Sequence, residues 1–508
     1  MFARLSICLA LLALSARFAP ASAASLPRFT TFGWLSPPPE FTDSTHVADY
    51  VDAGMNVLLP AWRDSGLAAD TQERLRLAHA RGALCIAWDR RFRQVDPANP
   101  ATIAPLDSVV ALFKDDPGFL AYYLGDEPDT SRLPLIARFF ALLAERDPAH
   151  PGWNNLSGRS SFASQADFLA SLRRYVATVH PKVLCADHYD LLTGRDRGLA
   201  VANAQGLAQV ARESGLPFWG IVLGIGHEPF REPNEGGMRW QIATLLAYGA
   251  RGIGWFTYWT PDFDPRYEWQ PALVDTAGRR TARHALARRV LGDTRAIGNE
   301  LAGSAWQRTQ FAGSAPEGGD PFVPDDRVVD VKGRICLAAF EDSLGRDVRF
   351  VANSDSLGAQ AVALLLARGR VCRVETFDPK TALWSESPLC DSSATPLLRL
   401  ALAPGEFTLV RLTPRAHGAG SGRATLEAWP NPARGTVTFS AGGCAPGTRL
   451  VVRDARGRRV RGLAVPADGA PVAWRGERGD GGRAAPGVYF ARLGEGPGAV
   501  ACRFVWSP

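Results

Sequence analysis

The stretch Gly118-Phe-Leu-Ala-Tyr-Tyr-Leu-Gly-Asp-Glu-Pro128 decides how the rest of the sequence is interpreted. Its apolar and aromatic run of about seven residues is typical of a buried strand. The run ends abruptly in Gly125, Asp126, Glu127 and Pro128, where the chain must turn and two carboxylates appear together. Acidic side chains are rarely buried without a partner, so a pair of them at the end of a strand needs a reason.

Two interpretations of this acidic pair are open. In a parallel α/β barrel the carboxyl ends of the strands form the catalytic face. A carboxylic acid held there beside an anionic neighbour has its pKa raised, as a general acid requires. Alternatively, Asp126 caps the next helix and Glu127 pairs with an arginine, because structural ion pairs also lie at strand ends.

The sequence around the pair alternates between strand-like and helical patterns from Phe29 to Gly303. Apolar runs predict eight strands, over Thr31–Trp34, Asn56–Ala61, Ala83–Trp88, Phe119–Leu124, Gly152–Leu156, Val183–His188, Phe218–Ile225 and Gly252–Trp259. Amphipathic patterns predict the helices between and after them, over His46–Ala53, Thr71–Ala80, Leu106–Phe113, Leu133–Arg146, Phe168–His180, Ala204–Ser214, Gly237–Tyr248 and Ala282–Leu301. Strict alternation predicts a parallel sheet, and eight units predict a closed (β/α)8 TIM barrel over residues 29–303.

Tryptophans gather at or near the predicted carboxyl ends of these strands, at Trp34, Trp62, Trp88, Trp255 and Trp259. Flat apolar rings suit the C–H face of a pyranose, while acids and amides bind its hydroxyl groups. On the eighth strand, period-two alternation places Trp255, Thr257 and Trp259 on one face. Packing of the barrel core accounts for some of these rings, but five at one rim favour a carbohydrate site.

A glycosidase needs a second carboxylate, about 5–5.5 Å from the first in a retaining enzyme and about 6.5–9.5 Å from it in an inverting one. Glu228 is the first acid beyond the seventh strand and is our choice for this role. Glu235 is the alternative nucleophile, although Asn234 before it is typical of a helix N-cap. A glutamate in a first helical turn complements the helix dipole without any catalytic role. The third alternative is that neither glutamate is the nucleophile.

The sixth predicted strand ends in a further polar group, formed by Asp187, His188, Tyr189 and Asp190. These side chains could hydrogen-bond a substrate or orient the nucleophile. A solvated cluster at a strand end is an equally plain interpretation.

Residues 29–303 resemble a clan A glycoside hydrolase barrel, and within it the family 42 β-galactosidase-like branch. The matching segments are Gly125–Pro128 after the fourth strand, Asp49–Asn56 leading into the second, and Ala247–Trp259 around the eighth. The resemblance implies retaining hydrolysis with Glu127 as the acid/base. In that clan the residue before the acid/base is usually Asn, and here it is Asp126. The predicted nucleophile, Glu228, lies in no firm motif.

The last third of the sequence is β-rich throughout. Short strand-like runs bounded by turns predict a β-sandwich over residues 325–414. A linker rich in Gly separates it from a small domain over residues 424–508. That domain resembles the Ig-like domain of flagellar hook-capping proteins and the C-terminal sorting domains of type IX secretion. The motifs that carry this resemblance are Pro430-Asn-Pro432, Val452–Arg458, Trp474-Arg-Gly476 and Gly487–Leu493.

Residues 1–23 have the features of a secretory signal peptide, with Arg4, the apolar run Leu5–Leu14 and the small residues Ala21-Ser22-Ala23. No later segment approaches about twenty apolar residues, so we expect no transmembrane segment in the mature protein. The 57 basic residues, nearly all arginines, are interleaved with 51 acids. No basic stripe is visible, which argues against a nucleic-acid partner.

The sequence therefore predicts an exported glycoside hydrolase that acts on a carbohydrate without a metal or another cofactor. Glu127 and Glu228 are its predicted catalytic residues, and the other strand-end residues bind the substrate. We expect it in the periplasm, at the cell surface or in the medium, with its C-terminal domain able to contact outer-membrane secretion machinery. The alternative is a non-catalytic carbohydrate-binding or cell-surface protein on a degenerate barrel, since fold does not establish function.

Overall fold

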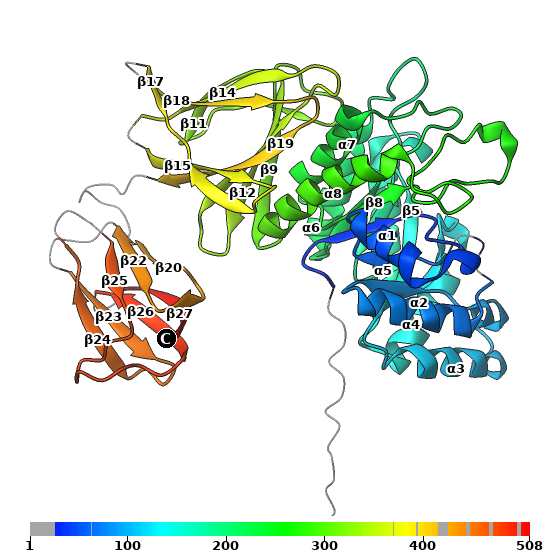
Figure 1. Ribbon diagram of the computed structural model, residues 1–508, viewed down its shortest axis with the longest axis horizontal. Coiled ribbons are helices and arrows are strands. Elements are labelled where there is room, and N and C mark those ends of the chain that lie inside the picture. The colour runs from blue at the N-terminus through cyan, green and yellow to red at the C-terminus, as the bar shows by residue number, and fades with distance from the viewer. Residues whose placement is uncertain are drawn as a thin grey trace, which may run out of the picture. The chain divides into compact units, whose positions relative to one another are not determined.

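The structure of the protein, a computed structural model, describes residues 26–508 apart from positions 62, 64, 369, 393–394, 415–424, 443–447, 467–470 and 495–498 (Figure 1). The predicted signal peptide, residues 1–23, and Trp62 lie outside the described residues. Contacts between residues divide the chain into two compact units. The first holds the barrel and most of the sheets that follow it, and the second holds the C-terminal β domain.

The first unit contains a closed parallel barrel of eight strands. These strands are β1 (Thr30–Gly33), β2 (Val57–Leu58), β3 (Leu84–Ala87), β4 (Phe119–Asp126), β5 (Gly152–Ser157), β6 (Leu184–Asp187), β7 (Phe218–Leu223) and β8 (Gly252–Phe256). They pair in sequence order, and β8 closes the barrel on β1, with Trp255 opposite Gly33. The predicted (β/α)8 fold is confirmed.

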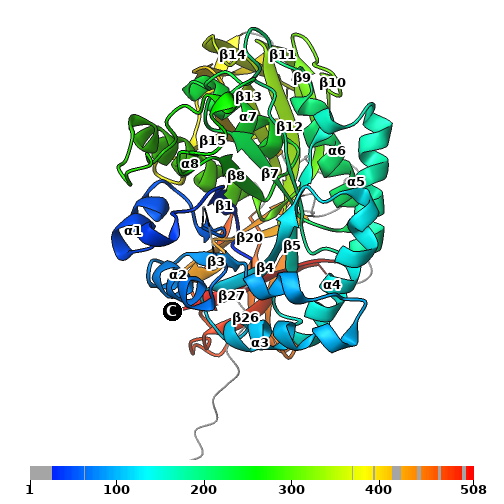
Figure 2. The same ribbon diagram turned by 90° about the vertical axis from the view of Figure 1, so that its right-hand side faces the viewer.

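Each barrel strand is followed by an α-helix, and the helices surround the strands (Figure 2). They are α1 (Ser44–Asp52), α2 (Ala68–Ala80), α3 (Ala104–Phe113), α4 (Leu133–Arg146), α5 (Gln165–Val179), α6 (Ala200–Ser214), α7 (Glu235–Ala247) and α8 (Ala282–Leu301). Helix α5 illustrates the pattern, since its buried residues Phe168, Leu172, Tyr175 and Val179 recur every three or four positions and form one apolar face. None of the described helices is long and apolar enough to cross a membrane.

Aromatic rings fill the interior of the barrel. Phe32 meets Trp153 edge-on, with ring centroids 5.9 Å apart, and contacts Trp219 at 5.7 Å. Each of the three side chains is at most 2% exposed. Gly254 on β8 makes room for Phe32, because a β-carbon at that position would collide with its ring. The barrel therefore has an apolar floor below the carboxyl ends of its strands.

After α8 the chain forms two antiparallel-rich sheets, which supports the predicted sandwich. The larger has the order β10-β9-β12-β13-β19-β15-β16, and the smaller has the order β11-β14-β18-β17. Their bounds are β9 (Ser304–Ala312), β10 (Asp320–Pro321), β11 (Val328–Lys332), β12 (Ile335–Asp342), β13 (Asp347–Asn353), β14 (Gln360–Leu366), β15 (Val371–Asp378), β16 (Leu383–Glu386), β17 (Cys390–Ser392), β18 (Thr395–Leu402) and β19 (Phe407–Pro414). The sequence predicts no strand between the helix that ends at Leu301 and Val328, yet β9 lies there and pairs with β12 along its length.

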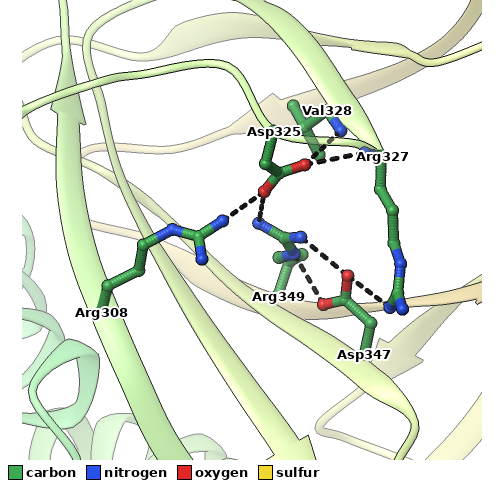
Figure 3. Close-up of polar contacts among 6 residues, drawn as sticks. All are labelled: Arg308, Asp325, Arg327, Val328, Asp347 and Arg349. Carbon is green, nitrogen blue, oxygen red and sulfur yellow. Dashed lines mark hydrogen bonds and ion pairs between the residues drawn. The ribbon is translucent and has the colours of Figure 1, made fainter.

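A network of ion pairs joins the larger sheet to the segment that leads into β11 (Figure 3). Arg349 on β13 donates two hydrogen bonds to Asp347, at 2.6 and 2.7 Å, and one to Asp325, at 2.7 Å. Arg308 on β9 contacts the same carboxylate of Asp325, and Arg327 lies 2.8 Å from Asp347. Arg349 is only 4% exposed, so its charge depends on these two carboxylates for compensation.

The second unit is an all-β domain built from two sheets, β20-β22-β25 and β21-β27-β26-β23-β24. The bounds of its strands are β20 (Thr425–Trp429), β21 (Ala433–Arg434), β22 (Val437–Gly442), β23 (Arg449–Asp454), β24 (Arg459–Ala464), β25 (Val472–Trp474), β26 (Gly487–Leu493) and β27 (Val500–Ser507). Its core contains Trp474, whose ring lies 5.4 Å from that of Trp506 and 5.8 Å from that of Phe504. The strand-rich C-terminal domain is thus present, while its resemblance to sorting domains stays a prediction.

Candidate active site

The acidic pair lies at the carboxyl end of β4, as the sequence predicts. Asp126 is the last residue of the strand and is in register with Asn155 on β5. Glu127 follows it with a φ of 38°, a left-handed conformation that residues other than glycine rarely adopt. Its backbone N–H donates to the carbonyl of Asn155 at 2.9 Å. This strained turn fixes the position of Glu127 at the mouth of the barrel.

A buried amide bridges the acid on β4 to an acid on β6. The Nδ2 atom of Asn155 donates to Asp126 and to Asp187, in both cases at 3.0 Å. Asn155 is 2% exposed, and its Oδ1 atom accepts from the thiol of Cys185 at 3.6 Å. Because the carboxylates need a donor and the thiol provides one, these contacts fix which side of the amide faces the acids. The amide joins Asp126 to Asp187, and the charge of Glu127 acts on Asp187, so the three carboxylates belong to one cluster.

Asp126 and Asp187 hold their protons more tightly than ordinary aspartates do. Burial raises the pKa of Asp187 to about 7, and the charge of Glu127 adds to the shift. Burial also raises the pKa of Asp126 to about 6, although the hydrogen bond from Asn155 opposes this and solvent still reaches the residue. Both pKa values lie near neutrality, where a group can act as an acid or a base in catalysis.

Two tyrosines flank the carboxylates. Burial raises the pKa of Tyr189, and the charge of Asp187, together with a hydrogen bond to it, adds to the rise. Burial and the charge of Asp126 raise the pKa of Tyr123. The ring of Tyr123 lies 6.3 Å from that of Trp34, which is half-buried over the apolar floor of the barrel. Trp34 and Tyr189 are thus placed where the sequence predicts substrate-binding residues.

A pocket of about 250 Å³ opens beside Trp34 and Tyr123. Its wall includes Trp88, whose ring face is covered by the guanidinium of Arg93 at 4.9 Å. Arg63 also lines this pocket. Of the other predicted rim tryptophans, Trp62 is outside the described residues, so its role stays a prediction.

Two of the polar residues after β6, His188 and Asp190, contact each other, and Asp190 also binds the backbone of the following loop. Asp190 accepts hydrogen bonds from the backbone of Gly198 and Leu199 and from His188, at 3.1, 2.8 and 3.2 Å. Those contacts hold the pKa of Asp190 below its ordinary value against the effect of burial. Asp190 therefore fastens the loop before α6 and holds the ring of His188, whose role in substrate binding stays a prediction.

The two candidate nucleophiles lie between the end of β7 and the first turn of α7. Glu228 is exposed, and its backbone N–H donates to the carbonyl of Tyr267 at 2.7 Å. Glu235 is in the first turn of α7, where the predicted cap Asn234 accepts from Gly237 N–H at 2.8 Å. Ion pairs of Glu235 with Arg239 and Arg289 lower its pKa against the effect of burial. A role in the first turn of the helix and in two ion pairs thus accounts for the surroundings of Glu235. Glu228 stays the predicted nucleophile.

Trp255 and Trp259 are placed differently from the expectation. Strand β8 ends at Phe256, so the predicted alignment of Trp255, Thr257 and Trp259 on one strand face is wrong. Trp255 is fully buried and Trp259 is 2% exposed, and both belong to the core cluster that also holds residues of the surrounding helices. A buried ring has no free face for a sugar. A β-carbon at Gly224, directly after β7, would collide with the indole of Trp255.

Asn155 and Tyr123 belong to the candidate site but are not among the residues that the sequence predicts for it, although both lie near strand ends. The sequence does contain one signal for Asn155. It is a polar residue inside the short predicted strand Gly152–Leu156, and a buried amide needs hydrogen-bonding partners. Its partners come from two other strands, which no local pattern reveals.

No protein-family model and no curated protein matches this sequence. Among solved structures, a GH42 β-galactosidase from G. stearothermophilus matches with a TM-score of 0.50 and 10% identity, over 77% of this chain and 99% of that one. A β-galactosidase from a Rahnella species matches with a TM-score of 0.43 and 13% identity, over 57% of this chain and 59% of that one. The chain thus spans about three fifths of that enzyme's length.

A GH99 endo-α-mannosidase from Bacteroides thetaiotaomicron matches with a TM-score of 0.37 and 14% identity, over 53% of this chain and 84% of that one. At such low sequence identities the similarity shows the fold alone. The comparison of folds rests on the match to the G. stearothermophilus enzyme. This chain therefore has the fold of a multidomain TIM-barrel protein with β domains after the barrel.

Proposed function

We propose that the protein is an exported glycoside hydrolase that cleaves O-glycosidic bonds at the carboxyl end of its barrel. One observation carries the proposal, namely that Asp126 and Asp187 share the buried amide of Asn155 while the charge of Glu127 acts on Asp187. Paired carboxylates whose surroundings separate their protonation are the working parts of glycosidases. The aromatic residues Trp34, Tyr123 and Tyr189 at the same mouth suit the apolar faces of a sugar.

In the retaining mechanism that the sequence predicts, Glu127 protonates the glycosidic oxygen as the bond to the anomeric carbon breaks. Glu228 attacks that carbon and forms a glycosyl ester. Glu127, now ionised, then takes a proton from water, which attacks the anomeric carbon and releases Glu228. The product keeps the configuration of the substrate.

A second assignment is favoured by the charge interaction between Glu127 and Asp187. Here the partner of Glu127 is Asp187 at the end of β6 instead of Glu228 after β7. Asp187 is already part of the cluster, whereas Glu228 contacts the carbonyl of Tyr267 through its backbone N–H. The two assignments differ in which acid, when removed, stops turnover.

The experiment measures hydrolysis of a panel of aryl glycosides, including β-galactosides, the substrate class of the GH42 enzyme. Glu127→Gln should reduce turnover of substrates with poor leaving groups by about 10²–10⁴-fold and affect activated substrates less. Glu228→Ala or Asp187→Ala, whichever removes the nucleophile, should abolish turnover and regain it with azide, giving a glycosyl azide. Glu213→Gln is the matched control, since this glutamate forms an exposed ion pair with Arg173.

Full activity of the Glu127→Gln variant on every substrate would refute the glycosidase mechanism. A wild-type protein that binds sugars but hydrolyses none would instead support the alternative of a carbohydrate-binding protein. We also propose that the C-terminal domain serves in sorting or anchoring after export, on the strength of its motifs.

A further inference from the structure

In the loop between β8 and α8, residues 262–270 carry three aromatic side chains, Phe263, Tyr267 and Trp269. Phe263 and Tyr267 are each 41% exposed, although large apolar side chains usually lie inside a protein. The ring of Trp269 lies 5.1 Å from each of the other two, and those two are 6.3 Å apart. Exposed rings that pack on one another form an apolar patch of the kind that binds ligands.

Contacts within the loop and with its neighbours hold these rings in place. Trp269 Nε1 donates to the carbonyl of Phe263 at 2.7 Å, and Glu228 N–H donates to that of Tyr267 at the same distance. An ion pair of 2.5 Å ties Asp262 at the start of the loop to Arg63, from the segment after β2. Because the rings are positioned before any ligand arrives, binding to them costs little conformational entropy.

Ring contacts connect the patch to the carboxylate cluster. Trp269 stacks on His227, with centroids 4.6 Å apart and planes inclined by 24°, and lies 6.2 Å from Phe256. Phe256 in turn lies 5.2 Å from Tyr189, the residue that hydrogen-bonds Asp187. An unbroken series of aromatic rings thus runs from the acids to the exposed edge of the barrel.

We propose that Phe263 and Tyr267 form a second sugar-binding subsite, so that the substrate is an oligosaccharide. One sugar unit lies at the carboxylate cluster, and a later unit stacks its C–H face on the two exposed rings. The proposal rests on the proposed function for the position of the first unit. Binding at the second subsite, however, does not require hydrolysis and can be measured without it.

The test uses the full chain carrying Glu127→Gln, titrated calorimetrically with linear galacto-, cello-, manno- and xylo-oligosaccharides of one to six units. In at least one series, affinity should rise by about tenfold or more as the chain becomes long enough to reach the loop. Adding Phe263→Ala and Tyr267→Ala should lower affinity for the long members by about tenfold per ring and reduce the preference for long over short chains. Tyr267→Phe, which keeps the ring, should retain the preference.

Phe490→Ala is the matched control, because Phe490 is a similarly exposed phenylalanine, at 38%, in the C-terminal domain. It should leave the preference for long chains intact. Affinity that does not depend on length, a preference unaffected by the two alanine substitutions, or no binding of any series would overturn the proposal. If the wild-type protein hydrolyses no aryl glycoside, the proposed function is refuted. The second subsite is still supported in that case if affinity rises with chain length and the loop variants lose this rise.

Discussion

The side-chain amide of Asn155 lies 3.0 Å from a carboxylate oxygen of Asp187, on the neighbouring barrel strand. The same nitrogen also donates to Asp126, so its two hydrogens serve two acids. Both hydrogen bonds favour the ionised form of the acid that accepts them, and both oppose the effect of burial on its pKa. Asn155 therefore controls the pH range in which the cluster can exchange protons.

Asn155→Leu removes this amide and keeps the same branching and number of heavy atoms in the side chain. The pKa values of Asp126 and Asp187 should then rise further, by about one to two pH units, since hydrogen bonds to charged groups contribute about 1.5–3 kcal/mol. Carbon-13 NMR titration of the aspartate carboxyls measures the shift directly, and the pH profile of kcat/KM on an aryl glycoside should move in the same direction. Unchanged carboxyl titrations in the variant would contradict the bridging role of Asn155.

Asp187 should make the folded protein less stable as the pH rises. Its folded-state pKa of about 7 lies above the ordinary value of 3.8, so between those values the folded state binds more protons than the unfolded state. The stability contributed by the protonated acid is present at low pH and is lost as the pH rises through about 7. Asp187→Asn should therefore raise Tm relative to wild type at pH 8 but not at pH 3.

Differential scanning calorimetry at the two pH values measures this difference. Asp107→Asn is the control, because Asp107 is an exposed acid, and it should produce no comparable gain at pH 8. A gain from Asp187→Asn that is equal at both pH values would mean that the charge of Asp187 is not its cause.

The ion-pair network of the sandwich should be sensitive to the loss of one member. Arg349→Met leaves the buried carboxylate of Asp347 without its main partner and should cost about 3–5 kcal/mol in the free energy of unfolding. Arg308→Met removes a partly exposed arginine from the same network and should cost about 1 kcal/mol or less. Denaturant titration followed by circular dichroism compares the two. Equal losses would show that the burial of Arg349 is irrelevant to its contribution.

Export should leave a shortened protein. Mass spectrometry of the native protein should find a new N-terminus near Ala24, after the predicted cleavage site Ala21-Ser22-Ala23. Protein purified from the cytoplasm with Met1 intact would contradict both the signal and the proposed location.

The barrel could be predicted because hydrophobic periodicity reports directly on burial. Helices α4 and α8 occupy the residues predicted for them, Leu133–Arg146 and Ala282–Leu301, since each has a continuous apolar face. Strand β9 could not be predicted, because the polar residues Gln307, Arg308 and Gln310 interrupt any alternation along it. The predicted eighth strand is too long for the opposite reason, because buried residues such as Tyr258 and Trp259 continue after the strand has ended.

Part of the candidate site could also be predicted, since the ends of parallel strands meet at one face. The positions of the strand ends alone predict that Asp126, Glu127, Asp187 and Tyr189 lie at this face. The placement of Glu228 could not be predicted, because it depends on contacts of a long loop with a second loop, such as the hydrogen bond to Tyr267. The hydrogen-bonded bridge through Asn155 could not be predicted for a similar reason, because it joins three strands that are distant in the sequence.

The close packing of Gly224 against Trp255 has a consequence for evolution and engineering. A side chain directly after β7 cannot be accommodated while the indole occupies that space. A relative with an acid at the position of Gly224 should therefore carry a smaller residue at that of Trp255, and the two positions should change together. For the same reason, grafting a carboxylate onto this end of β7 requires a paired substitution, such as Gly224→Glu with Trp255→Ala.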